Sequence, residues 1–379
     1  MKTIGLIAEY NPFHNGHLYQ INKIKERYPD SLIIAIISTN FTERGDISIV
    51  NKWDKTKICL ECGIDLIVEL PTLYATQSAD IFAYAAINIL NNLKIDTLVF
   101  GTESDNLEDL IMMANTSLNN KKYDELVKKY LDKGLNYPTA KSKAIYDLTN
   151  KEIDKPNDLL ALSYIKEIIK NNYNITPVSI KRTNNYHAKE IDSNIISANL
   201  IRELLNDNKD ISSYIPKTTN KYIIKDLNIN NAYNYLIYNI ENNKKELTKY
   251  LTVDEGIENR ILNSIYKTNN FEDLIMMIKT KRYTYNKIKR MLIHILLNIK
   301  KTDNDYQTYI RILGFNKKGR NYLNKIKKEI NIPVFTNYKP NILNVFDIEF
   351  HSTFIYSLII NDKSLIEKEY KSIPIIIDD

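Results

Sequence analysis

Two histidines, His14 and His17, are the residues of this sequence whose types and spacing best suit chemistry on phosphate groups. They lie between KTIGLI, an apolar run of strand length, and LYQINKIKERY, whose apolar residues have helical spacing. Open α/β sheets bind phosphates at such a turn from strand to helix. If Gly16 and His17 open the helix, the two imidazoles lie on one side of its first turn, beside free backbone N–H groups that attract anions. We therefore predict a polyphosphate site, the alternatives being a histidine pair that caps the helix or binds a metal.

The next predicted strands bring further polar residues to the same place. LIIAIIST, DLIVEL and TLVFG have the length and composition of buried strands, and ADIFAYAAINIL has a helical apolar face. Strand–helix–strand alternation predicts a parallel sheet with right-handed crossovers, in which these strands end at one edge. Arg44 and Lys52 follow the second strand, and Gly101 ends the fourth. A glycine there lets a ligand approach the backbone closely, although an ordinary turn residue is the alternative.

Three further residues suit an anion in the part of the chain that follows. Arg182 ends the predicted strand TPVSIKR, at the same edge if that strand is parallel. Ser197 caps the predicted helix ISANLIRELL, and Arg202 lies about one and a half turns later. A serine hydroxyl, helix-start N–H groups and a guanidinium can together hold a phosphate, unless they are only a cap and a surface arginine. Another predicted helix, PNDLLALSYIKEII, has Asn157 or Asp158 as its N-cap.

The length and composition exclude several classes of protein. At 379 residues the chain can hold two domains, and 44% hydrophobic and 26% charged residues are typical of soluble proteins. No apolar run reaches the roughly 18 residues that cross a bilayer, and MKTIGLIAEYNPF does not resemble a signal peptide, so we expect a cytoplasmic protein. Cys59 and Cys62 favour two buried or half-buried thiols over a zinc site or a disulfide. The net charge of +6 permits an acidic partner such as RNA.

The second half of the chain has a different periodicity and two groups of basic residues. Residues 106–150 read as amphipathic helices that cover the sheet, and strand–helix alternation fades after Tyr214. We therefore predict a doubly wound parallel-sheet α/β domain in residues 1–215 and a mainly α-helical domain in residues 216–379. Basic residues interleaved with tyrosines suit an RNA backbone and its bases, the alternative being a solvated helix face. These residues are Lys279, Lys281, Arg282, Lys289 and Arg290, with a second basic group in residues 311–320.

Several stretches resemble known families. The HNGH turn and ISANLIR resemble the HxGH and ISxxxIR motifs of the nucleotidyltransferase superfamily, whose doubly wound fold is related to class I aminoacyl-tRNA synthetases. AEYNPFHNGH, NFTERGDISIVNKW, DLIVELP, YATQSADIFA, FGTES, TKRYTYNKIKRMLIHILL and YIRILGF resemble the bacterial tRNA(Met) cytidine acetate ligases, over nearly the whole chain. The sequence departs from that pattern at Thr39, where glycine is usual, at Glu43, where glutamine is expected, and in residues 184–188.

The resemblance implies an enzyme that joins acetate to AMP from ATP. It would then pass the acetyl group to the exocyclic amine of the wobble cytidine of elongator tRNA(Met), giving N4-acetylcytidine. His14 and His17 would stabilise charge on the phosphates, Arg182 or Arg202 would hold the leaving pyrophosphate, and Mg²⁺ would accompany ATP without a dedicated metal site in the protein. By resemblance or from the anion pattern above, the residues expected to contact ATP are Ile7, Ala8, Glu9, Tyr10, Asn11, Pro12, Phe13, His14, Asn15, Gly16, His17, Leu18, Tyr19, Gln20, Gly101, Asn157, Arg182, Ser197 and Arg202.

Two other functions stay open on the sequence alone. A cofactor-type adenylyltransferase would share the fold and the histidine turn but act on a small molecule, and the basic second half disfavours it. A non-catalytic RNA-binding protein with a relic ATP site would not need to keep both histidines and Arg202. Acetate-dependent pyrophosphate release in the absence of tRNA would separate the three functions.

Overall fold

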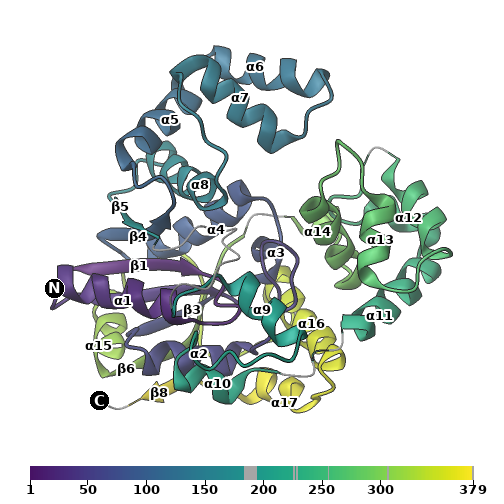
Figure 1. The fold of residues 1–379 in the computed structure, drawn as a ribbon. Coiled ribbons are helices and arrows are strands. Elements are labelled where there is room, and N and C mark those ends of the chain that lie inside the picture. The colour runs from purple at the N-terminus through teal and green to yellow at the C-terminus, as the bar shows by residue number, and fades with distance from the viewer. Residues whose placement is uncertain (183–193, 225–226, 228, 255, 305–306, 378–379) are drawn as a thin grey trace.

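The computed structural model describes residues 1–182, 194–224, 227, 229–254, 256–304 and 307–377. The departure noted at residues 184–188 lies outside them. The described residues form one mixed sheet with strand order β5-β4-β1-β2-β3-β6-β7 and β8 beside β6 (Figure 1). The strands from the first half of the chain run parallel, which confirms the predicted parallel sheet; they are β1 (Thr3–Ala8), β2 (Leu32–Ser38), β3 (Leu66–Leu70), β4 (Thr97–Thr102) and β5 (Thr176–Lys181).

Helices cover both faces of this sheet, which explains why its strands are apolar throughout. Every residue of β2 is buried, and alternate residues belong to two different core clusters. One cluster includes α4 (Ala79–Asn92) and α8 (Pro156–Lys170), and the other includes α1 (Asn15–Arg27), α2 (Lys52–Glu61) and α9 (Ala198–Asn206). Parallel sheets are usually buried in this way. On α2, Cys59 is buried and Cys62 half-buried, and both are free thiols, as predicted.

The second half of the chain makes a helical lobe and then returns to the sheet. The helical lobe, on the right in Figure 1, consists of α11 (Ile229–Asn242), η1 (Lys244–Lys249), α12 (Ile257–Ile265), α13 (Phe271–Ile278) and α14 (Tyr285–Leu296). β6 (Ile310–Asn316) then pairs antiparallel with β3, so the sheet crosses the predicted division at residue 216. IRILGF has the length and apolar content of a buried strand, which the neighbouring basic residues conceal in the sequence.

The remaining elements of the described chain are short or lie near the returning segment. They are α3 (Thr72–Ala75), α10 (Lys217–Tyr222), η2 (Lys301–Asp303), α15 (Lys317–Ile326), β7 (Val334–Phe335), α16 (Asn344–Ile359), α17 (Ser364–Lys371) and β8 (Ile375–Ile377). None of the helices in the described ranges combines the length and the apolar composition that crossing a membrane requires.

Buried ion pairs attach the returning segment to the sheet. Lys52 Nζ lies 2.9 Å from Glu69 of β3, 3.2 Å from Glu349 of α16 and 2.8 Å from Glu369 of α17. Arg311 of β6 pairs with Glu369 and lies 3.5 Å from Glu69. All five side chains are buried, so loss of one partner would leave an uncompensated charge at a cost of about 3–5 kcal/mol. The expectations of Lys52 in a polar loop at the site and of Arg311 in a basic surface group are therefore wrong.

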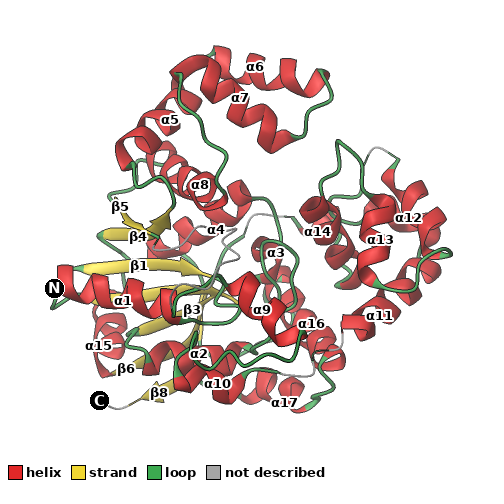
Figure 2. Cartoon of the chain, viewed as in Figure 1, coloured by secondary structure: helices red, strands yellow, loops and turns green. Residues whose placement is uncertain are grey.

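Three helices form a separate upper lobe, which contains α5 (Leu107–Asn119), α6 (Lys122–Asp132) and α7 (Tyr137–Thr149). They pack against α8 and one another, and Figure 2 shows α6 and α7 standing away from the sheet. The prediction that residues 106–150 cover the sheet is wrong, because α4 and α8 already occupy the face beneath them.

Candidate active site

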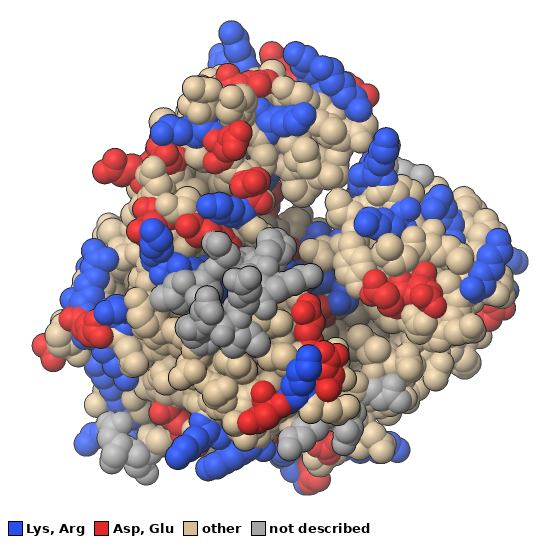
Figure 3. All heavy atoms as spheres, in the orientation of Figure 1, with Lys and Arg blue, Asp and Glu red and all other residues tan. Residues whose placement is uncertain are grey.

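A cavity of about 640 Å³ lies at the edge of the sheet where β1, β4 and β5 end. Tyr137 and Lys141 line it from the upper lobe, and Asn286 and Arg290 line it from the helical lobe. Figure 3 shows the hollow between these two lobes on the surface of the molecule. The cavity is therefore bounded by all three parts of the protein.

Most of the residues expected to contact ATP line this cavity: Ile7, Ala8, Glu9, Tyr10, Asn11, His14, Gly16, His17, Tyr19, Gln20, Gly101, Asn157, Arg182, Ser197 and Arg202. The structure places Pro12, Phe13, Asn15 and Leu18 outside the lining. Phe13 is buried in the core, and Leu18 packs against the same core from the first turn of α1. The Asn15 side chain donates hydrogen bonds to two backbone carbonyls of the chain around α9 instead of facing the cavity.

The histidine pair is fixed by the backbone of its own turn. His14 is the N-cap of α1, and its Nδ1 accepts a hydrogen bond from Gly16 N at 3.0 Å. His17 Nδ1 accepts from His14 N at 3.1 Å, and the two rings stack with centroids 3.7 Å apart. A Cβ at position 16 would lie 2.8 Å from His14 Cε1, so only glycine fits between the histidines. Because each Nδ1 is an acceptor, each neutral ring carries its proton on Nε2.

Both histidines are neutral at pH 7. Burial, followed by the charges of Arg182 and Arg202, lowers the pKa of His14 to about 3. Burial and the neighbouring His14 lower the pKa of His17 well below its usual value. The pair therefore offers two uncharged Nε2–H donors at the cavity.

The prediction of free backbone N–H groups at this helix start is wrong. Asn15 N donates to Tyr214 O at 3.0 Å, and Gly16 N is bonded to the His14 ring. His17 N and Leu18 N both donate to His14 O. The imidazoles replace the backbone as the donors available to a ligand. The capping alternative is thus part of the geometry, since the same rings cap the helix and line the cavity.

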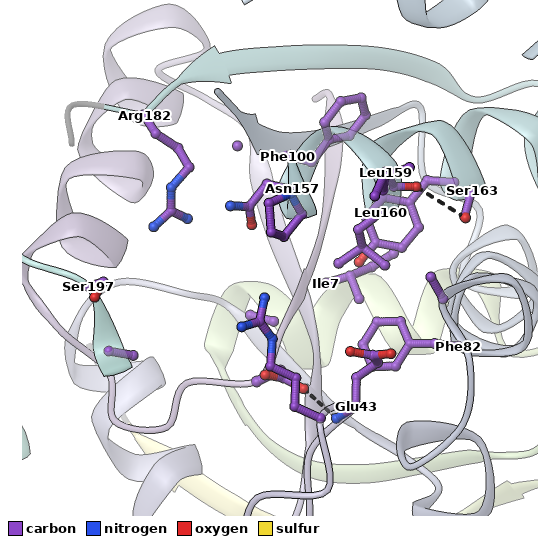
Figure 4. A pocket seen from close by; sticks show the side chains of 18 of the residues that line it. Ile7, Glu43, Phe82, Phe100, Asn157, Leu159, Leu160, Ser163, Arg182 and Ser197 are labelled. Atoms are coloured by element: carbon purple, nitrogen blue, oxygen red, sulfur yellow. Dashed lines mark hydrogen bonds between the residues drawn. The ribbon is translucent and has the colours of Figure 1, made fainter. Parts of the chain in front are cut away.

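The two arginines have different surroundings. The Nε of Arg182, which directly follows β5, is buried and has no hydrogen-bond partner, and Figure 4 shows the side chain reaching toward the cavity. Burial lowers the pKa of Arg182. A Cβ at Gly101 would lie 3.3 Å from Arg182 Cγ, so the glycine gives this side chain room. Arg202, by contrast, donates to Asn11 O at 2.7 Å and to Asp46 at 3.1 Å. Arg182 is therefore the better placed of the two for an incoming anion.

Ser197 and Asn157 are held by contacts that the sequence showed only in part. Ser197 is the N-cap of α9, and its hydroxyl accepts from Leu200 N at 3.2 Å, as expected of a cap. Helix α8 has Lys155 as its N-cap, so the expectation of Asn157 or Asp158 there is wrong. Asn157 instead donates to the Glu103 carboxylate from both its backbone N, at 3.1 Å, and its Nδ2, at 2.5 Å. Glu103 thus orients Asn157 at the cavity wall.

The cavity has a cationic side and an apolar side. Figure 4 shows Arg182 and Ser197 on one side and Ile7, Phe82 and Leu159 on the other. The cationic side suits phosphates, and the apolar side suits the flat, uncharged part of a ligand. Among the described residues, no group of three or more His, Cys, Asp or Glu side chains is arranged to hold a metal ion.

The basic residues expected to bind RNA divide into two sets. Lys279, Lys281 and Arg282 are exposed at the surface of the helical lobe. Lys289, however, pairs with Asp46, and Arg290 pairs with Glu43 at 2.8 Å, both in the loop after β2. The glutamate at position 43, a departure from the family pattern, therefore holds the helical lobe to the cavity wall. The other departure, Thr39, is buried and donates to Glu349 at 2.7 Å.

Comparison with known proteins agrees with this geometry. A family model described as HIGH Nucleotidyl Transferase matches residues 1–371. The chain is 38% identical to the tRNA(Met) cytidine acetate ligase of Thermoanaerobacter sp. (strain X514), covering 96% of this chain and 97% of the relative. The chain belongs to the tRNA(Met) cytidine acetate ligase family. As a member of that family it is an ATP-dependent ligase.

Solved structures of this family have the same fold. The apo structure of Thermotoga maritima TmcAL matches with a TM-score of 0.91 at 27% identity, covering 100% of both chains. A second structure of Thermotoga maritima TmcAL, bound with alpha-thio ATP, matches with a TM-score of 0.89 and the same coverage. The doubly wound fold predicted from the histidine turn is thereby confirmed.

Proposed function

We propose that this ligase forms acetyl-AMP from acetate and ATP and transfers the acetyl group to the exocyclic amine of the wobble cytidine of elongator tRNA(Met), giving N4-acetylcytidine. The observation that carries the proposal is the stacked histidine pair, which directs two neutral Nε2–H donors at a cavity beside a buried, unpartnered guanidinium nitrogen. The names of the full-length relatives supply the two substrates, acetate and tRNA(Met).

The first step needs positioning and charge stabilisation more than covalent help. An acetate oxygen attacks the α-phosphorus in line, and pyrophosphate leaves with the bonding electron pair. His14 and His17 stabilise negative charge on the phosphate oxygens through Nε2–H, and Arg182 binds the pyrophosphate. Any Mg²⁺ would be held mainly by phosphate oxygens, because the described residues offer no cluster of metal-ligating side chains.

The second step brings a large, anionic acceptor to the same cavity. We propose that residues 216–379 contribute the tRNA-binding surface and residues 1–215 the catalytic one, in the cytoplasm. Lys279, Lys281 and Arg282 are exposed and free of the ion pairs that hold Lys289 and Arg290 to the cavity wall. Figure 3 shows further Lys and Arg side chains on both lobes that flank the hollow. A bound tRNA would also cover the cavity and protect the mixed anhydride from water.

The test supplies the enzyme with ATP, isotopically labelled acetate and unmodified elongator tRNA(Met). We expect the label in N4-acetylcytidine at the wobble position, measured by mass spectrometry of the digested tRNA. A tRNA with uridine at that position is the matched control and should stay unlabelled. Label in the control, or an adenylylated small molecule as the only product, would contradict the proposal.

A further inference from the structure

Glu9, the first residue after β1, lines the cavity as an unpaired carboxylate. Its Oε1 accepts a hydrogen bond from Glu43 N at 2.5 Å, and no cation pairs with it in the described part of the chain. Lys55 is close, but its Nζ donates to the backbone carbonyls of Glu9, Ser38 and Thr39 at 2.8–2.9 Å. These three bonds use all the protons of the ammonium group, so the carboxylate of Glu9 is left without a partner of opposite charge.

The other acids at this wall have cationic partners. Glu43 Oε1 lies 2.8 Å from Arg290, and Asp46 lies 3.1 Å from Arg202. Their contacts hold the loop after β2 against α9 and α14. Glu9 is therefore the acid at this wall that is not committed to holding the structure together.

The groups that face Glu9 determine its protonation. Burial and the charge of Glu43 raise the pKa of Glu9 to about 7; the more distant Asp46 adds to the rise, and the Glu43 backbone N–H and Arg44 oppose it. Tyr164, on the apolar side, is a further titratable neighbour, and burial and the charge of Glu9 raise its pKa. Glu9 is therefore a base that is about half ionised at neutral pH, which is the range that proton transfer favours.

We propose that Glu9 is the general base of the acetyl-transfer step, accepting a proton from a nucleobase amine seated against the apolar side of the cavity. The inference rests on the proposed function. An unpaired carboxylate repels phosphate and acetate, so its position suits a group that has a proton to give. The apolar side near it, with Ile7, Phe82 and Leu160, offers the surface on which a planar base packs (Figure 4).

The chemistry of the acceptor explains why a base is needed. The lone pair of a cytosine amine is delocalised into the ring, so the nitrogen becomes acidic only as it bonds to the acyl carbon. The N–C bond forms, and the bond between the acyl carbon and the bridging phosphate oxygen breaks. AMP leaves with that electron pair. The amine proton moves to the Glu9 carboxylate and then to water, so that charge and atoms balance.

The two half-reactions of Glu9→Gln should separate. Chemically prepared acetyl-AMP and tRNA(Met) in a single-turnover reaction measure transfer alone, and acetate-dependent ATP–pyrophosphate exchange without tRNA measures the first step. We expect the substitution to slow transfer about 10²-fold more than exchange, the lower end of general-base catalysis. With the unsubstituted protein, transfer should rise with pH to a plateau with a midpoint near pH 7, and in Glu9→Gln this rise should disappear.

Glu43→Gln is the matched control. It keeps the backbone N–H that Glu9 accepts but removes the neighbouring negative charge, so the midpoint of the transfer profile should move to lower pH. A purely structural Glu9 would give no such shift. Transfer by Glu9→Gln at the unsubstituted rate, or an equal loss in both half-reactions, would overturn the proposal and in the second case assign Glu9 to ATP. Failure of the unsubstituted protein to acetylate tRNA from acetyl-AMP would remove the proposed function, and this inference with it.

Discussion

Replacing His14 by asparagine separates its two roles. The His14 ring accepts the Gly16 N–H through Nδ1 and leaves Nε2–H for a ligand. Asparagine is one of the preferred N-cap residues, and its side-chain oxygen can accept from the same turn of backbone. His14→Asn therefore keeps α1 capped while removing the donor that faces the cavity.

The expected loss follows from the geometry. A single donor aimed at charge that develops in a transition state is worth about 10²–10³-fold in rate, or about 2.7–4 kcal/mol. We expect His14→Asn to slow acetate-dependent ATP–pyrophosphate exchange by at least about 10²-fold. His17→Ala should cost about as much. Thermal unfolding of His14→Asn should stay near that of the unsubstituted protein, whereas His14→Ala should also lose about 1 kcal/mol of stability with its cap.

The pH dependence gives a second check on the same residues. Because the pKa of His14 is about 3 and that of His17 is also lowered, no histidine should titrate in the exchange reaction between pH 5.5 and 8. A pair that acted as imidazolium would instead lose activity as pH rose through 6.5. Exchange by His14→Asn at the unsubstituted rate would show that the pair only caps the helix, and the reasoning about its donors would fail.

Three further outcomes follow from other contacts. Arg182→Ala should weaken ATP use by at least about tenfold in exchange, since bonds to charged groups are worth about 1.5–3 kcal/mol; unchanged kinetics would remove it from the site. Replacing the exposed Lys281 and Arg282 by alanine should slow tRNA acetylation and flatten its salt dependence by about 0.7–0.9 per lost phosphate contact, while exchange continues; normal acetylation would move the tRNA site elsewhere. Burial lowers the pKa of His294 to about 4, so the unfolded chain binds a proton that the native state does not, and the free energy of unfolding should fall by up to about 1.4 kcal/mol per pH unit from pH 6.5 down to 4. His294→Gln should make that slope shallower in urea titrations at stepped pH, and an identical slope would contradict this assignment.

The sequence predicted the parts of the fold that depend on local pattern. Apolar runs alternating with helical stretches were enough to predict a parallel sheet, and the spacing of His14 and His17 placed them at its edge. Their hydrogen bonding was not accessible in the same way, because it depends on which ring nitrogen meets a backbone N–H. Gly16 carried the available signal, since a residue without a side chain between two histidines allows their rings to stack.

Long-range pairing accounts for what the sequence concealed. Lys52 and Arg311 read as polar surface residues, but their partners Glu349 and Glu369 lie far away along the chain. Strand β6 is likewise one short apolar run among basic residues, and only its pairing with β3 identifies it as part of the sheet. Glu9 gave no signal by itself, because its lack of a cation becomes visible only when Lys55 is seen bonded elsewhere.

The most direct test of the central claim is a crystal structure of this protein with a non-hydrolysable ATP analogue. We predict phosphate oxygens within hydrogen-bonding distance of Nε2 of both His14 and His17, with the guanidinium of Arg182 on the β- or γ-phosphate. The Nδ1 contacts of the histidine pair should be unchanged from those described above. Phosphates bound away from the pair, or histidine rings turned so that Nδ1 faces the nucleotide, would contradict the account.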